Sequence, residues 1–157
     1  MKPLRILIAV VILLCVSTSA LSSTPLSETV LKHKAEEFIR AKNARQQPNT
    51  SIEDVEKFIS LFSDNFIDEH IKFNVTVTKK SELRKGMVAK LEDKVYFCEV
   101  KIDQLMFGRN VAFIKYTEHA KVKPSHMSKA VEYTSTNIVS LEFDDNGLIK
   151  HLRRHHG

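Results

Sequence analysis

The chain has 157 residues and a formal net charge of +5, with 24 basic and 19 acidic side chains. The roughly 137 residues that follow Ala20 are enough for one domain with its own core but too few for two domains. Without Lys2 and Arg5 the net charge falls to about +3, which is weak evidence for a polyanion partner. We therefore expect no nucleic-acid partner.

The first twenty residues form a pattern typical of a secretory signal peptide. Lys2 and Arg5 precede an apolar run over 6–16, which is shorter than the about 20 apolar residues of a membrane-spanning helix. Thr18 and Ala20 supply small residues at the −3 and −1 positions of a cleavage site. We predict a signal peptide at 1–20, a secreted or periplasmic protein, and no stable membrane insertion after cleavage. An uncleaved anchor is the alternative.

Apolar residues at steps of three and four predict three helices in the first part of the remaining chain. Thr50 and Glu53 have the spacing of a capping box, which predicts the start of the second helix. A short extended stretch separates the second helix from the third, which Thr78 or Ser81 is expected to cap. The first predicted helix begins at Ser27, has its last apolar residue at Ala41 and is interrupted by the QQPNTS sequence at 46–51; the other two cover 52–66 and 81–91.

Beyond Asp93 the apolar period changes from nearly four to two, which predicts β-strands. Turn residues at 107–110 and the Asn146-Gly147 pair separate these strands. Cys98, the one cysteine after Ala20, falls in the first strand, where we expect a buried thiol and no disulfide. Helices followed by a meander of strands indicate an α+β fold. The predicted strands cover 96–103, 111–122, 131–143 and 148–154.

The stretches SIEDVEKFISLFSDNFIDEHIKF and IVSLEFDDNGLIKHLRRH, with the order of elements between them, resemble the nuclear transport factor 2-like superfamily. Within it, the SnoaL-like and ketosteroid-isomerase-like groups are the most similar. The resemblance runs from about Ser27 to the C-terminus, predicts a single domain at 21–157, and implies a cone in which a curved antiparallel sheet wraps around three N-terminal helices. It also implies an enclosed apolar pocket and a homodimer formed through the outer face of the sheet.

The resemblance also implies a position for a catalytic base. In the isomerase-like members the base follows the second helix by a few residues, where this chain has His70. An imidazole, with an unperturbed pKa of about 6.5, can act as a general base at neutral pH. Neighbouring residues of an extended segment point to opposite faces, so Asp68 rather than Glu69 is expected to orient His70. The alternative is a structural role for His70 at the rim of the core.

The same resemblance argues against steroid isomerase chemistry. The two positions that hold oxyanion donors in those enzymes correspond to Phe38 and Val139 in this chain. Neither side chain can donate a hydrogen bond, so the electrostatic contribution that is usually largest for enolate chemistry has no source at these positions.

Strand alternation gives a second set of candidate site residues. Glu118 shares the apolar, even-numbered face of its strand with Tyr116, so we expect a buried carboxylate that needs a partner. Alternatively, Glu118 lies in water at a strand end or bulge, and the polar residues of the next strand bind backbone or water. If they converge with His70 in a mainly apolar cavity, they form a small-molecule site. The candidate ligand-binding residues are Tyr96, Tyr116, Glu118, Tyr133, Ser135 and Asn137.

The C-terminal sequence KHLRRHHG contains several histidines but does not predict a metal site. His151 and His155 are expected on one face of a strand with Arg153 between them, and a cation between two ligands repels a metal ion. We predict neither a metal nor a cofactor. A basic terminal strand is more typical of a solvated edge.

These observations leave three functions open. The leading hypothesis is an exported SnoaL-like domain that binds a small, largely apolar molecule in its cone, with catalysis undecided. The second is a lyase, isomerase or hydrolase with His70 as its base and Asp68 as the orienting carboxylate. The third is a protein-interaction module whose cone is filled by side chains.

Overall fold

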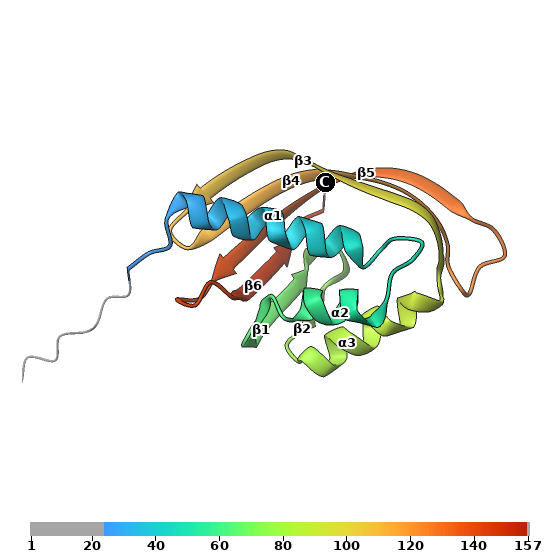
Figure 1. Ribbon diagram of the computed structural model, residues 1–157, viewed down its shortest axis with the longest axis horizontal. Helices are drawn as coiled ribbons and strands as arrows, with labels where there is room; N and C mark the ends of the chain where they lie inside the picture. Colours follow the sequence, from blue (N-terminus) through green and yellow to red (C-terminus); the bar gives the residue numbers. More distant parts are fainter. Residues whose placement is uncertain (1–23, 157) are drawn as a thin grey trace, which may run out of the picture.

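A computed structural model describes residues 24–156, so the predicted signal peptide at 1–20 lies outside the described residues. Three helices and six strands form the α+β fold that the sequence predicts (Figure 1). The helices are α1 (Glu28–Ala44), α2 (Ile52–Ile59) and α3 (Lys80–Ala89). The strands are β1 (Phe62–His70), β2 (Val75–Val77), β3 (Lys94–Gly108), β4 (Val111–Lys123), β5 (Val131–Phe143) and β6 (Ile149–Arg154).

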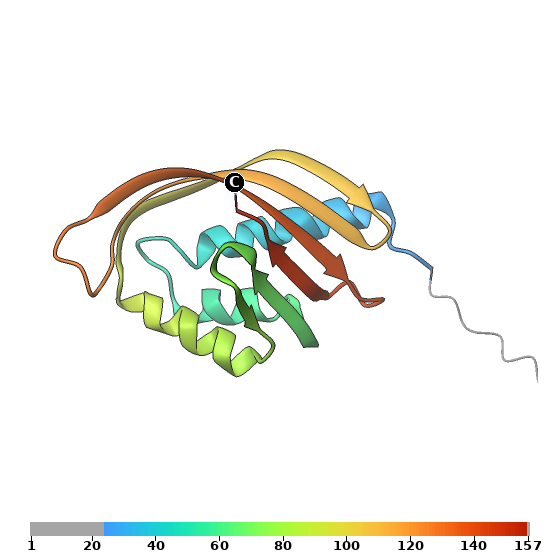
Figure 2. The ribbon, with the colours of Figure 1, turned by 180° about the vertical axis from the view of Figure 1, so that it is seen from behind.

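The six strands form one open sheet in the order β2-β1-β6-β5-β4-β3. Strands β3 to β6 form the predicted antiparallel meander. The sheet as a whole is mixed rather than antiparallel, because β1 pairs in parallel with β6. The long strands β3, β4 and β5 bend over α1, while β1, β2 and β6 form a second wall (Figures 1 and 2). This arrangement confirms the predicted cone.

The residues predicted to complete the second helix form a strand instead. Helix α2 ends at Ile59 and β1 follows, so the predicted helix at 52–66 is wrong beyond Ile59. Phe58, Phe62 and Phe66 recur every four residues, a spacing that keeps side chains on one face of a helix and also of a strand. Their ring centroids are 5.3 Å apart between Phe58 and Phe62, and 5.1 Å apart between Phe62 and Phe66. The three rings therefore stay in contact on one buried face although the backbone changes from helix α2 to strand β1.

Two helix starts differ slightly from prediction. The capping box of α2 uses Ser51 and Asp54, one residue later than expected, and the Ser51 backbone N–H donates to Asp54 Oδ2 at 2.9 Å. Helix α3 has Lys79 at its N-cap position, with no hydrogen bond from that side chain, so neither Thr78 nor Ser81 is the cap. The helices themselves are confirmed, but their first residues shift.

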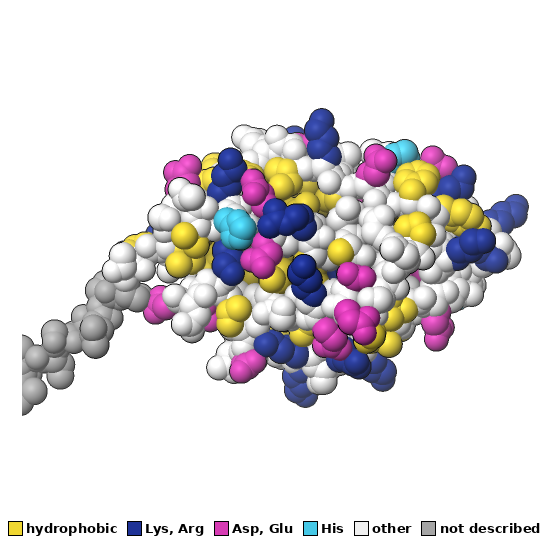
Figure 3. All heavy atoms as spheres, in the orientation of Figure 1, with side chains coloured by type: hydrophobic (Ala, Val, Ile, Leu, Met, Phe, Trp, Pro, Cys, Tyr) yellow, Lys and Arg dark blue, Asp and Glu magenta, His cyan; other side chains and the backbone are white. Residues whose placement is uncertain are grey.

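The hydrophobic core lies between α1 and the concave face of the sheet. As strand alternation predicts, the even-numbered residues of β4 point into it, and Ala112 and Ile114 have no exposed surface. No helix within 24–156 is long and apolar enough to cross a membrane. Lys, Arg, Asp and Glu side chains intermingle on the face shown in Figure 3. The largest fully buried side chains include Phe38, Phe58, Phe62, Phe66, Phe143, Leu31, Ile114, Leu141, Ile149 and Leu152.

Strand β3 forms one edge of the sheet and is interrupted twice. Its pairing with β4 shifts between Val95 and Phe97, and again between Ile102 and Gln104. Each shift is a bulge, in which an extra residue bends the strand and breaks the regular alternation of its side chains. The first bulge contains Tyr96, whose side chain the sequence placed in the cone.

Candidate functional site

A pocket opens where the ends of α1, β1 and β6 approach α3. Its volume is about 200 Å³, below the roughly 300–1,000 Å³ typical of pockets for drug-sized ligands. We call it the His70 pocket. Val77, Leu83 and Met87 give it an apolar wall, and Gly86 lies beside them on α3. Its charged and titratable lining residues are Arg45, Asp68, His70, Glu82, Lys90 and Arg154.

The structure brings Asp68 and His70 together but commits Asp68 to a different partner. Asp68 is fully buried, and the parallel pairing of β1 with β6 places Arg154 opposite His70, from where its side chain reaches Asp68. Arg154 donates to both carboxylate oxygens, from Nε to Oδ1 and from Nη2 to Oδ2, each at 2.8 Å. His70 Nε2 lies 3.7 Å from Asp68 Oδ1, too far for a hydrogen bond. Asp68 therefore neutralises Arg154 and does not orient the imidazole directly.

Glu69 lies between Asp68 and His70 in sequence, and its side chain is on the opposite face of β1 from theirs. Its Oε2 is 2.8 Å from His151 Nε2 and accepts a hydrogen bond from Arg153 Nε at 2.7 Å. The Arg153 and His151 contacts hold the pKa of Glu69 below its usual value. His151 and Arg153 thus join an ion-pair cluster at the surface. No cluster of three or more potential metal-ligating side chains occurs within 24–156.

His70 is placed as a half-buried, neutral side chain of the pocket. Burial, with the positive charge of Arg154, lowers the pKa of His70 from its ordinary value of 6.5. The side chain keeps 30% of its surface exposed. A neutral imidazole can accept a proton or a hydrogen bond at neutral pH, so His70 has the state required of a base. Within residues 24–156, however, the structure shows no carboxylate hydrogen-bonded to it.

Arg45 is a pocket residue that the sequence analysis missed. The sequence analysis has the QQPNTS sequence at 46–51 interrupt the first helix, and α1 ends just before it, at Ala44, with Arg45 as its C-cap residue. The guanidinium lies over the Phe58 ring, 4.6 Å from the centroid, and its Nε is buried without a hydrogen-bond partner. Burial, followed by repulsion from Arg154, lowers the pKa of Arg45 to about 10. It therefore remains charged at neutral pH.

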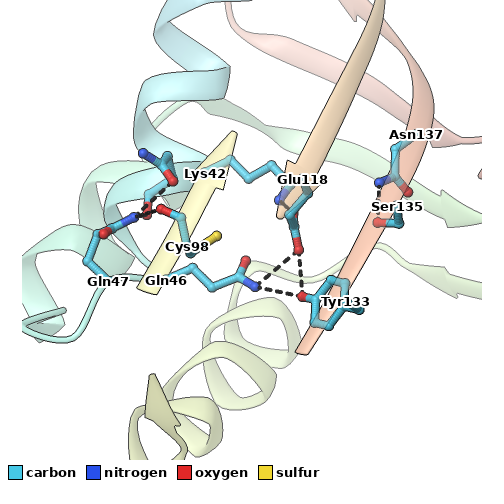
Figure 4. A network of polar contacts seen from close by, with 9 residues as sticks. Lys42, Gln46, Gln47, Cys98, Glu118, Tyr133, Ser135 and Asn137 are labelled. Atoms are coloured by element: carbon cyan, nitrogen blue, oxygen red, sulfur yellow. Dashed lines mark hydrogen bonds and ion pairs between the residues drawn. The ribbon is translucent and has the colours of Figure 1, made fainter. Parts of the chain in front are cut away.

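Glu118 is buried, as strand alternation predicts, and Lys42 is the partner that the sequence analysis did not identify. Lys42 is only 5% exposed and pairs with Glu118 Oε2. Tyr133 donates to Glu118 Oε1 at 2.7 Å, and Gln46 donates to the same oxygen at 3.3 Å (Figure 4). Burial by itself raises the pKa of Glu118, but the charge of Lys42, together with the hydrogen bonds to Glu118, outweighs this effect and holds that pKa below its usual value. We call these four residues the Glu118 network.

The remaining predicted site residues do not line the His70 pocket. Asn137 Nδ2 donates to Ser135 Oγ at 3.1 Å on β5 (Figure 4). Tyr116 is buried in the core, and this burial raises its pKa to about 12. Tyr96 is 43% exposed at the β3 bulge, and Lys94 Nζ lies 4.9 Å from its ring centroid. The bulge explains why strict alternation misplaced Tyr96.

A second pocket of about 220 Å³ lies on the other side of Arg45. Gln46 and Tyr133 of the Glu118 network line it, together with Arg45 and Lys90, which also line the His70 pocket. The predicted site residues are thus divided: Tyr133, a predicted ligand-binding residue, lines this second pocket, while the predicted catalytic residues His70 and Asp68 line the first. Arg45 and Lys90 are the residues common to both.

Comparisons with known proteins identify the fold. No protein-family model and no curated protein matches the sequence. A candidate SnoaL-like polyketide cyclase from Shewanella denitrificans superposes with a TM-score of 0.65 at 11% identity, over 80% of this chain and 88% of that one. The epoxide hydrolase/cyclase-like enzyme SalBIII superposes with a TM-score of 0.66 at 13% identity, over 83% of this chain and 93% of that one. An epoxide hydrolase from M. tuberculosis superposes with a TM-score of 0.62 at 16% identity, over 82% of this chain and 84% of that one.

Proposed function

The chain has the fold of the SnoaL-like and nuclear transport factor 2-like proteins, and we propose that it is an exported domain that binds a small molecule in the His70 pocket. The observation that carries this proposal is the make-up of the pocket. An apolar wall of Val77, Leu83 and Met87 meets His70 and a few charged groups in an unfilled space of about 200 Å³. This combination is typical of small-molecule sites.

Catalysis with His70 as general base is the second candidate function. The lowered pKa of His70 supports it, as does the presence of hydrolase-like proteins among those of similar fold. Two observations count against a mechanism like that of the isomerases. Asp68 is bonded to Arg154, and the positions of the two oxyanion donors hold the buried side chains of Phe38 and Val139. We therefore place binding before catalysis.

The His70 pocket counts against the third hypothesis, an interaction module whose cone is filled by side chains. The outer face of the sheet, however, has features that support a homodimer. Met106, Phe113 and Ile138 are exposed there and surround a shallow apolar groove. We propose that a second copy of the chain covers this groove. Phe113→Asp is expected to shift the molecular mass measured by light scattering from dimer to monomer, whereas a wild-type monomer would contradict the proposal.

Gly86 offers a direct test of binding. Gly86 lines the pocket, and a Cβ atom at this position would meet no atom within 4 Å, so Gly86→Leu adds a side chain there that begins in open space. Replacing glycine inside a helix also favours folding, by up to about 1 kcal/mol. We expect Gly86→Leu to raise the melting temperature and to abolish the shifts that small ligands cause in a thermal screen.

Ala89→Leu is the matched control, because Ala89 is an exposed residue of the same helix that does not line the pocket. It should keep the ligand-induced shifts. If Gly86→Leu binds every ligand as the wild type does, the His70 pocket is not the binding site.

A further inference from the structure

We propose that the ligand of the His70 pocket is an amphiphilic carboxylate, whose anionic group binds Arg45 and Lys90 and whose apolar part lies against Leu83 and Met87. This inference rests on the proposed function, because it names the chemical class of the molecule that the same pocket binds. Its basis is an imbalance of charge among the residues that line the pocket.

The acidic residues of the pocket are already engaged. Asp68 accepts two hydrogen bonds from Arg154. Glu82 is exposed and lies 3.5 Å from Lys79. Neither carboxylate is therefore available to Arg45.

The cations Arg45 and Lys90 have no such partner. Among residues 24–156, the structure shows no ion pair or side-chain hydrogen bond for either one. Lys90 is exposed at the pocket, so water can solvate it. Arg45 differs because its Nε is enclosed and its guanidinium lies against the Phe58 ring. A bound anion would therefore supply the counter-charge for these two cations.

The geometry of Arg45 favours a carboxylate. A guanidinium presents its donors in a planar fork that matches a carboxylate, and such pairs are stronger than hydrogen bonds between neutral groups. Because Arg45 Nε is enclosed, the Nη donors remain for a ligand. The ring of Phe58 and the partial negative charge at the C-terminal end of α1 stabilise the cation in part, but neither supplies an acceptor oxygen in hydrogen-bond geometry.

The test compares ligands that differ only in charge. Straight-chain carboxylates from butanoate to decanoate are titrated into the protein by calorimetry at constant ionic strength, beside the amides and alcohols of the same lengths. A hydrogen bond to a charged group is worth about 1.5–3 kcal/mol, so the best carboxylate should bind roughly tenfold to a hundredfold more tightly than its amide.

Variants connect this preference to Arg45. Arg45→Met should remove the preference for the carboxylate and leave binding of the alcohol within about threefold, a free-energy difference smaller than that of one hydrogen bond. Arg40→Met is the matched control, since Arg40 is an exposed arginine of the same helix that pairs with Glu36. A second variant, Arg45→Lys, keeps the charge without the fork and should keep part of the preference.

The outcomes separate the two proposals. Equal affinity for carboxylate, amide and alcohol would overturn the anion inference and leave small-molecule binding intact. An unchanged carboxylate preference in a folded Arg45→Met protein would also overturn it, since the charge would then be recognised elsewhere. If none of the compounds binds, both the inference and the proposed function fail.

Discussion

Two cations at the end of α1, buried Lys42 and half-buried Arg45, have opposite surroundings, although they are only three positions apart in sequence. Lys42 lies beside Glu118, which Tyr133 and Gln46 also contact, so the charge is balanced inside the protein. Arg45 lies against an aromatic ring and is repelled by Arg154; Glu118 and Asp68 attract it from a distance, but the structure shows no ion pair for it among residues 24–156. The comparison distinguishes a charge that belongs to the folded core from one that is left for a ligand.

Breaking the balanced pair should have the largest effect. Glu118→Gln leaves the Lys42 ammonium buried without its counter-charge, and removal of one partner from a buried pair destabilises a protein by about 3–5 kcal/mol. We expect a loss of this size in the free energy of unfolding measured with urea. The double variant Lys42→Met with Glu118→Leu should recover most of it. A loss below about 1 kcal/mol in Glu118→Gln would contradict the assignment of this pair to the core.

Removing a charge at Arg45 should raise the free energy of unfolding, whereas removing the charge of Glu118 lowers it. Arg45→Met removes a half-buried charge for which the structure shows no ion pair among residues 24–156, and replacing such a group by an apolar side chain is expected to stabilise the empty protein by about 1 kcal/mol. The cation–π contact with Phe58 reduces this gain. Urea unfolding of Arg45→Met beside Arg40→Met measures the difference. A loss of more than about 2 kcal/mol would mean that Arg45 is a structural cation, like Lys42.

The smallest expected effect concerns pH. The folded-state pKa of His70 is lowered from 6.5, first by burial and then by Arg154, so the unfolded chain takes up the proton more readily. The stability that His70 contributes is therefore complete above pH 6.5 and is lost as the pH falls toward the folded-state pKa. His156, whose pKa is also lowered by burial, acts in the same direction.

His70→Gln should make the urea midpoint less sensitive to pH between about 7.5 and 5, since one of the groups that titrate in this range is removed. His33→Gln, which changes an exposed histidine of α1, serves as the control. An identical pH dependence in His70→Gln and the wild type would show that solvent screens this imidazole fully.

Alternation and helical spacing predicted most of the fold because they report which residues are buried. The even face of β4, including Glu118, is buried as predicted, and the bounds predicted for β5 are the observed ones. The predicted second helix was too long because a spacing of four fits a helix and a strand equally well. Only packing, here the series of rings from Phe58 to Phe66, settles which backbone is adopted.

The candidate site was harder to predict because its decisive contacts join distant parts of the chain. Asp68 and Arg154 meet through the parallel pairing of β1 with β6, and no local pattern in the sequence indicates that pairing. Arg45 was missed because it lies beyond Ala41, the last apolar residue of the helical pattern, and apolar spacing gives no information on a charged residue at the C-cap. A charged residue at a helix end resembles a solvated one until the surrounding elements are placed around it.

The interrupted pairing of β3 has a consequence for how copies of the protein can meet. A long, regular sheet border exposes a row of free peptide groups that invites another chain to add a strand, which leads to fibres. The kinks at Tyr96 and Asp103 divide this border into shorter stretches, so continuous strand addition from outside is disfavoured. If copies of the chain associate as proposed above, this border favours contacts through side chains over the addition of a strand.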